Sequence, residues 1–147
     1  MSSNESARRP TGVLLVNLGT PDAPETAPVR RYLSQFLSDP RVLTLPAPLR
    51  WLLLHGVILR TRPAKSAAAY RAVWLPEGSP LLVHSKALAD GVAASLGEDY
   101  RVELAMRYGE PSIERGLAAL EASDVGRVIV LPLFPQYASS VTASVSA

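Results

Sequence analysis

The sequence contains no cysteine among its 147 residues. This absence excludes disulfide bonds, a thiolate nucleophile, zinc–thiolate sites and cysteine-ligated iron–sulfur clusters within these residues, and it gives no indication of secretion. Only two histidines occur, His55 and His84, and neither has a second histidine or a carboxylate at ligand spacing. A metal site built inside the chain is therefore not predicted.

Several other signals are missing as well. No apolar run reaches the length of a membrane span, and residues 1–11 lack the apolar segment of a signal peptide and read as a flexible polar tail. There is no glycine-rich phosphate loop and no nucleophile elbow. The net charge of +2 is too small to predict a nucleic-acid partner. With 48% hydrophobic and 19% charged residues, the chain is expected to be a soluble, cytoplasmic globular protein.

Short apolar segments that alternate with helical patterns predict an α/β fold with a parallel sheet. Ser79 and Pro80 are expected to open one of the helices as its cap and first residue, and Gly97 to end it. Buried strands are predicted at residues 12–18 and 127–133, and a strand with alternating apolar residues at 100–106. Helices are predicted at 25–38, 48–60, 63–74, 80–96 and 111–122. Three strands make a small sheet for such a fold, and the chain ends where a crossover should follow, so residues 12–147 read as one incomplete lobe.

The charge distribution is uneven between Pro40 and Pro76, where no aspartate or glutamate occurs. An apolar surface fringed with arginine suits an anionic membrane surface or a flat apolar ligand that carries carboxylates. A buried helix with arginines at its rim would give the same pattern, and nucleic acid is disfavoured because aliphatic rather than stacking aromatic residues separate the cations. The basic residues of this segment are Arg41, Arg50, Arg60, Arg62, Lys65 and Arg71.

Ligand sites of parallel sheets lie beyond the carboxyl ends of the strands. Here those ends carry the segments 16–21, 107–111 and 132–137, each of which also fits an ordinary turn. Taken from the residues alone, the chain offers part of a ligand-binding site and no complete catalytic set.

Together, these motifs resemble the ferrochelatase family, in order and with fitting spacing from Gly12 to the end of the chain. Each is weak alone, and the ordered set is specific. The matching segments are GVLLVNLGTP at 12–21, RRYLSQFLSDPRV at 30–42, RTRPAKSAAAY at 60–70, EGSPL at 77–81, AMRYGEP at 105–111 and LPLFPQYASS at 131–140.

The resemblance implies two Rossmann-like lobes with a porphyrin cleft between them, of which this chain is the first, and a metal-inserting lyase that places ferrous iron in a porphyrin to form haem. The family's metal-handling histidine and glutamate belong to the second lobe, so no catalytic residue is expected here and the chain alone should be inactive. Iron is a substrate, and no other cofactor is expected. Some relatives hold an iron–sulfur cluster through cysteines, but Ser139 stands at one such position, so no cluster is expected.

The resemblance also implies which residues contact the porphyrin. Leucine at position 18, where one branch of the family has tyrosine, favours protoporphyrin IX over coproporphyrin. Arg60 could replace Arg62 in the match, because small insertions make the two interchangeable. The expected contacts are Leu18, Phe36, Val42, Arg62, Tyr70, Ser79, Arg107, Tyr108, Phe134, Gln136 and Tyr137.

Two further hypotheses stay open at this stage. One is a non-catalytic module that binds a porphyrin or a membrane surface, and the other is a nucleotide-binding domain, which the missing phosphate loop disfavours. Under the leading hypothesis, peripheral contact with the inner face of the membrane is expected through residues 48–60.

Overall fold

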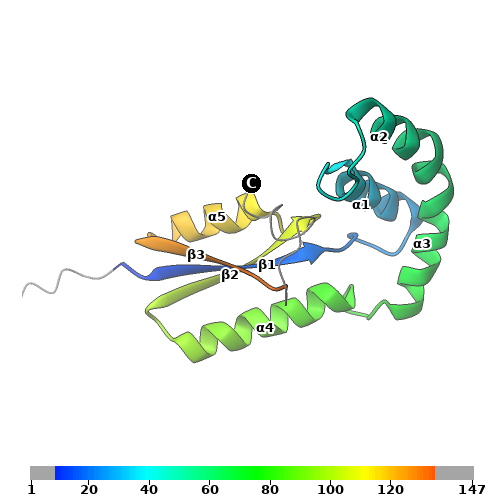
Figure 1. The fold of residues 1–147 in the computed structure, drawn as a ribbon. Helices are drawn as coiled ribbons and strands as arrows, with labels where there is room; N and C mark the ends of the chain where they lie inside the picture. The colour runs from blue at the N-terminus through cyan, green and yellow to red at the C-terminus, as the bar shows by residue number, and fades with distance from the viewer. Residues whose placement is uncertain (1–8, 135–147) are drawn as a thin grey trace, which may run out of the picture.

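The computed structural model of the protein describes residues 9–134, and these form a parallel sheet with helices on both faces. The strands are β1 (Thr11–Gly19), β2 (Tyr100–Tyr108) and β3 (Arg127–Pro132), in the order β2-β1-β3. Both pairings of β1 are parallel. The α/β prediction and the Rossmann-like arrangement are therefore confirmed (Figure 1).

Helices α4 (Pro80–Leu96) and α5 (Ile113–Ala122) cover opposite faces of the sheet (Figure 1). Because successive side chains of a strand point to opposite faces, β1 feeds both layers of the core. Val13 and Leu15 pack with Ala89 of α4, whereas Leu14 and Val16 pack with Leu120 of α5. This two-sided burial explains the unbroken apolar run that predicted β1.

The ends of α4 follow the predicted capping chemistry. The Ser79 hydroxyl accepts a hydrogen bond from the Leu82 N–H at 3.2 Å, and Pro80 is the first helical residue. Gly97 follows the helix with φ of 74°, a left-handed conformation that glycine adopts without a side-chain penalty. Strand β1 begins at Thr11, just inside the segment predicted as the polar tail.

The remaining helices stand beyond the carboxyl ends of β1 and β2 (Figure 1). They are α1 (Thr26–Ser38), α2 (Ala47–Leu53), a π-helical turn η1 (Leu54–Ile58) and α3 (Leu59–Val73). The prediction of two separate helices over 48–60 and 63–74 is wrong, because α2, η1 and α3 follow one another without a break and Pro63 lies inside α3. A proline ring disturbs the carbonyl four residues earlier, and here that carbonyl belongs to Leu59, at the junction with the wider π turn.

Strand β3 differs from its predicted burial. It pairs with β1 on one side and forms one edge of the sheet. Its four apolar residues between Val128 and Leu131 are 38–50% exposed, because no element within residues 9–134 covers the faces of this strand. The expectation of a third buried strand is therefore wrong for the described part of the chain.

None of the helices within residues 9–134 combines the length and the apolar character needed to cross a bilayer.

Candidate functional site at the carboxyl edge of the sheet

The loops that follow β1 and β2 touch each other at the carboxyl edge of the sheet. Asn17 pairs with Met106 and Gly19 with Tyr108, so Leu18 and Arg107 lie side by side on the two strands. Gly19 has φ of 129°, and a Cβ there would overlap the carbonyl oxygen of Tyr108. The backbone therefore approaches closely at a point where the sequence predicted a ligand-facing turn.

Helix α1 is tied to this edge by its side chains. The Tyr32 hydroxyl donates to the carbonyl of Gly19 at 3.2 Å, and the Gly109 N–H donates to Oε1 of Gln35 at 2.9 Å. The Phe36 ring packs edge-on against the Tyr108 ring, with centroids 5.2 Å apart. Burial raises the pKa of Tyr32 well above its usual value, so this hydroxyl stays protonated and keeps donating.

Asp39, at the C-terminal end of α1, accepts hydrogen bonds from the end of β2 and from the turn after α1. Its Oδ2 accepts a hydrogen bond from the Tyr108 hydroxyl at 2.8 Å and another from Nη2 of Arg107 at 3.2 Å. Its Oδ1 accepts from the Arg41 N–H at 2.8 Å. One carboxylate thus joins the end of β2 to the turn that follows α1.

The ionisation of Asp39 follows from these partners. Burial raises the pKa of the Asp39 carboxyl, but the Arg41 N–H, the Tyr108 hydroxyl and the nearby Arg107 guanidinium together lower it more. The net effect holds the pKa below its usual value, so the group is a carboxylate at neutral pH.

Arg107 and Tyr108 differ in how far a ligand could reach them. The Tyr108 side chain is enclosed, because the residue is only 2% exposed. The Arg107 side chain is 26% exposed and its guanidinium lies 5.0 Å from the centroid of the Tyr108 ring. The Nε of Arg107 is buried and finds no hydrogen-bond partner within residues 9–134. Of the two predicted contacts, Arg107 is the group that faces outward.

The other predicted porphyrin residues lie on neighbouring elements. Val42 is half-buried in the turn after α1, and its N–H donates to the carbonyl of Asp39 at 3.0 Å. On α3, Arg62 is exposed and Tyr70 is half-buried, and burial raises the pKa of the Tyr70 hydroxyl. Ser79 is buried, and its hydroxyl caps α4 as described above.

The predicted contacts after β3 are only partly described. Phe134 is half-buried at the end of the described region, and the preceding residue Leu133 donates its N–H to the carbonyl of Val16 at 2.8 Å. Gln136 and Tyr137 lie outside the described residues. The structure therefore brings Leu18, Phe36, Arg107 and Tyr108 together, and places Arg62 and Tyr70 on a separate helix.

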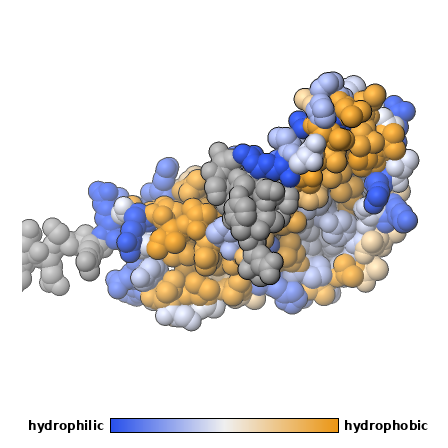
Figure 2. All heavy atoms as spheres, viewed as in Figure 1, coloured by the Kyte–Doolittle hydropathy of each residue, from blue (hydrophilic) through white to orange (hydrophobic). Residues whose placement is uncertain are grey.

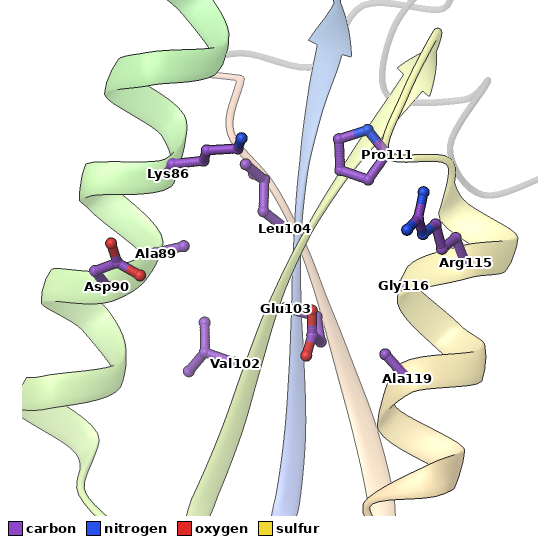
Figure 3. Close-up of a pocket in the computed structure, with 10 residues that line it drawn as sticks. All are labelled: Lys86, Ala89, Asp90, Val102, Glu103, Leu104, Pro111, Arg115, Gly116 and Ala119. Atoms are coloured by element: carbon purple, nitrogen blue, oxygen red, sulfur yellow. The ribbon is translucent and has the colours of Figure 1, made fainter. Parts of the chain in front are cut away.

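Two of the cavities in the described region lie close to the strands that carry the site. One, of about 390 Å³, lies at the carboxyl edge between α1 and the loops after β1 and β2, and its lining includes Tyr32, Gln35 and Gly109 but none of the predicted porphyrin residues. The other, of about 290 Å³, lies along β2 between α4 and α5. Figure 3 shows Leu104 pointing from β2 toward α4 and Glu103 toward α5 within it. This second cavity is away from the carboxyl edge, so it is not part of the candidate site.

Metal ligands do not cluster in the described region. Residues 9–134 contain no group of three or more histidine, aspartate or glutamate side chains placed to hold an ion. His55 and His84 are both exposed, and the His55 ring stacks on Trp51 at 4.9 Å.

An exposed apolar surface covers α2 and η1. Figure 2 shows apolar residues gathered at this end of the molecule, beside hydrophilic ones. Trp51 is 62% exposed and Leu52 is 60% exposed, in the segment that the sequence marked by its arginines and lack of acids. We call this surface the α2 patch; its exposed large apolar residues are Leu49, Trp51, Leu52 and Val57.

The sequence did not single out Asp39 as a site residue, although it lies in the matching segment 30–42. A signal was present, because a carboxylate at a helix C-terminus is disfavoured by the helix dipole and needs a compensating cation. Among the three segments at the strand ends, only 107–111 contains a basic residue, Arg107. An ion pair between Asp39 and Arg107 could therefore have been predicted.

Comparison with known proteins identifies the family. The ferrochelatase family model matches residues 10–147. The ferrochelatase of Coxiella burnetii (strain Dugway 5J108-111) is 56% identical over 133 residues, which are 90% of this chain and 38% of that protein. The ferrochelatase of Marinobacter nauticus is 53% identical over 137 residues, 90% of this chain and 37% of the relative. That of Azoarcus sp. (strain BH72) is 55% identical over 137 residues, 92% of this chain and 38% of the relative.

The chain thus spans less than two-fifths of the length of these curated relatives, while nearly all of it is matched. The family match also covers each segment that forms the carboxyl edge, from β1 through α1 to β2 and β3. The chain therefore belongs to the ferrochelatase family.

Proposed function

We propose that the protein to which these residues belong inserts ferrous iron into a porphyrin, as a lyase of haem biosynthesis, and that residues 12–147 supply the first lobe of its porphyrin site. The family match over residues 10–147 is the observation that carries this proposal. Relatives named ferrochelatase extend well beyond the matched region. The residues that complete the reaction would therefore lie outside the 147 residues, and this chain alone would not insert iron.

The described residues suit one side of a porphyrin. A porphyrin is flat and apolar, with carboxylates at one edge, and a site for it needs apolar walls and arginines at the rim. Phe36, Val42 and Leu18 supply partly buried apolar surface near the carboxyl edge, and Arg62 supplies an exposed guanidinium. The leucine at position 18 favours protoporphyrin IX as the substrate.

Metal insertion requires removal of two pyrrole protons and distortion of the ring from planarity. The half-buried Phe36 ring is supported from behind by the enclosed Tyr108 ring, and it gives this lobe a firm surface against which a macrocycle could be bent. We infer that the lobe contributes to binding and distortion, and that the base acts from the other lobe.

The porphyrin contacts are testable by titration. In an absorbance titration of the 147-residue chain with protoporphyrin IX, Arg62→Ala should weaken binding by about threefold to tenfold, because an arginine–carboxylate contact is lost. Tyr70→Phe should weaken it by about threefold, because the porphyrin would lose the hydrogen bond that the Tyr70 hydroxyl is proposed to donate. Arg127→Ala is the matched control, because Arg127 is exposed at the opposite end of the sheet. Unchanged affinity in both Arg62→Ala and Tyr70→Phe would contradict the proposed site.

We further propose that the protein is cytoplasmic and touches the inner face of the membrane peripherally through residues 48–60. The support is the α2 patch, whose exposed tryptophan and leucines lie on the same continuous helical run as Arg50, Arg60 and Arg62. Apolar side chains enter the headgroup boundary, while basic ones are attracted to anionic lipid.

Sedimentation with lipid vesicles tests this contact. The double variant Trp51→Ser/Leu52→Ser should bind anionic vesicles at least about tenfold more weakly than the unchanged chain. The substitutions remove two apolar side chains, and with them the free energy gained by burying their surface in the membrane. Leu88→Ser is the control, since Leu88 is an exposed leucine of α4 outside the α2 patch. Equal binding of the double variant and the control, or equal binding to purely zwitterionic vesicles, would contradict the proposal.

A further inference from the structure

Asp39 stands where a carboxylate is expected to be unfavourable. It follows the last residue of α1, and its side chain is 7% exposed. Both the helix dipole and the loss of water oppose a negative charge at this place. The charged form of Asp39 is therefore stabilised by the hydrogen-bond donors around it.

The surrounding groups come from two segments that are far apart in the sequence. Nη2 of Arg107 and the hydroxyl of Tyr108, at the end of β2, bind Oδ2. In the turn after α1, the Arg41 N–H binds Oδ1, and the N–H groups of Val42 and Leu43 bind the Asp39 carbonyl at 3.0 Å each. A single residue therefore fixes the end of β2 against the turn that carries Val42.

The hydrogen bonds to Asp39 also determine the orientation of Arg107. One guanidinium nitrogen is bound to Oδ2, and the plane of charge lies over the Tyr108 ring, whose own hydroxyl is bound to the same oxygen. The Phe36 ring packs edge-on against Tyr108. Few alternative rotamers of Arg107 preserve this set of contacts, so the guanidinium is preorganised before any ligand arrives.

The pairing divides the arginines of the proposed site into two kinds. Arg107 has its charge offset by a carboxylate 3.2 Å away. Arg62 is exposed and has no ion pair with any residue of the described region. A guanidinium whose charge is neutralised by a carboxylate can line the wall of a site for a flat apolar ring at a lower desolvation cost. A guanidinium without an ion-pair partner is better placed to bind the carboxylates of the ligand.

We propose that Asp39 is a positioning residue for porphyrin binding, which holds Arg107 in one orientation and offsets its charge, so that this arginine forms part of the wall beside the ring rather than a grip on the carboxylates. The inference rests on the proposed function and assigns a task to a residue outside the predicted contact set.

The test is a double-mutant cycle on protoporphyrin IX affinity in the 147-residue chain, with thermal unfolding followed in parallel. Asp39→Asn keeps the shape but removes the charge, and it should weaken binding about fivefold. In an Arg107→Ala background the same substitution should change affinity by less than about twofold, because Asp39 then has no arginine to position. Asp124→Asn is the matched control, because Asp124 is an exposed carboxylate paired with Arg9 at the far end of the sheet.

Rescue separates positioning from general stabilisation. Asp39→Glu retains the charge but displaces it by one methylene, so its affinity should fall between those of the unchanged chain and Asp39→Asn. If Asp39→Asn does not fold, Asp39→Glu carries the same cycle, with an expected weakening of about twofold to threefold that disappears in the Arg107→Ala background.

The outcomes distinguish this inference from the proposed function. If Arg107→Ala weakens porphyrin binding while Asp39→Asn matches the Asp124→Asn control, the positioning role is wrong and the porphyrin site stands. Equal effects of Asp39→Asn in both backgrounds would show a structural role that does not pass through Arg107, and would also overturn the inference. If Arg107→Ala leaves the affinity unchanged, the proposed contact at Arg107 fails, and the role of Asp39 fails with it.

Discussion

A hybrid chain should insert iron where the 147-residue chain does not. The hybrid joins residues 1–147 to the part of the Coxiella burnetii ferrochelatase that lies beyond the matched region, a junction supported by 56% identity over 133 residues. Under anaerobic conditions with ferrous iron and protoporphyrin IX, we expect the hybrid to exceed the 147-residue chain by at least about a thousandfold in rate, a modest share of typical enzymatic acceleration.

The physical reason is the division of labour proposed above. Under this proposal, binding and distortion of the ring need the walls of this lobe, whereas the base that removes the pyrrole protons acts from the other lobe. The rate is measured from the loss of porphyrin fluorescence and the appearance of the metalloporphyrin spectrum.

Two controls make the result decisive. The Coxiella burnetii segment expressed alone should be inactive, which shows that the first lobe is required. An Arg107→Ala hybrid should be slower than the unchanged hybrid, because the wall beside the ring is disturbed. Enzyme-like turnover by the 147-residue chain alone would refute the division of labour. Porphyrin binding by a folded hybrid without turnover would favour the non-catalytic module instead.

The substitution Gly19→Ala should destabilise the fold more than any other single methyl addition at a described glycine. Gly19 has φ of 129°, where residues with a Cβ are strained, and the new methyl group would overlap the carbonyl oxygen of Tyr108. Both effects act where the paired strands β1 and β2 end, at Gly19 and Tyr108. We expect a loss of about 2–4 kcal/mol in the free energy of unfolding, measured by urea denaturation followed by circular dichroism.

Gly91→Ala provides the matched control on the same chain. Gly91 lies inside α4, and a Cβ there meets no atom within 4 Å. Replacing a helical glycine by alanine should therefore stabilise the protein by about 0.5–1 kcal/mol. The argument about Gly19 would be wrong if Gly19→Ala unfolded at the same urea concentration as the unchanged chain.

The features of the fold that are determined by residues close together in the sequence could be predicted. Ser79, Pro80 and Gly97 marked both ends of α4 correctly, because caps act within one helical turn. The run of aliphatic residues in β1 indicated a strand buried on both faces, and α4 and α5 do cover it. The placement of Leu18 beside Arg107 followed from the rule that parallel strands end at one edge.

What depends on neighbours in space was predicted less well. The composition of β3 is as apolar as that of β1, so the sequence could not show that one is central and the other lies at an edge with exposed faces. The continuity of α2, η1 and α3 past Pro63 depends on a π turn, which has no recognised residue pattern. Asp39 contacts Arg107 and Tyr108, which are 68 and 69 residues away in the sequence. The periodic patterns that predict helices and strands carry no information about a contact between such distant residues.

The three ties of α1 to the sheet limit how the length of the chain can vary. Tyr32, Gln35 and Asp39 are spaced by three and four residues, so they lie along one stripe of the helix. One residue inserted before this stripe would rotate it by about 100° and turn all three side chains away from their partners together. Insertions and deletions among homologous chains should therefore be absent from α1, where one added residue would break all three of these bonds.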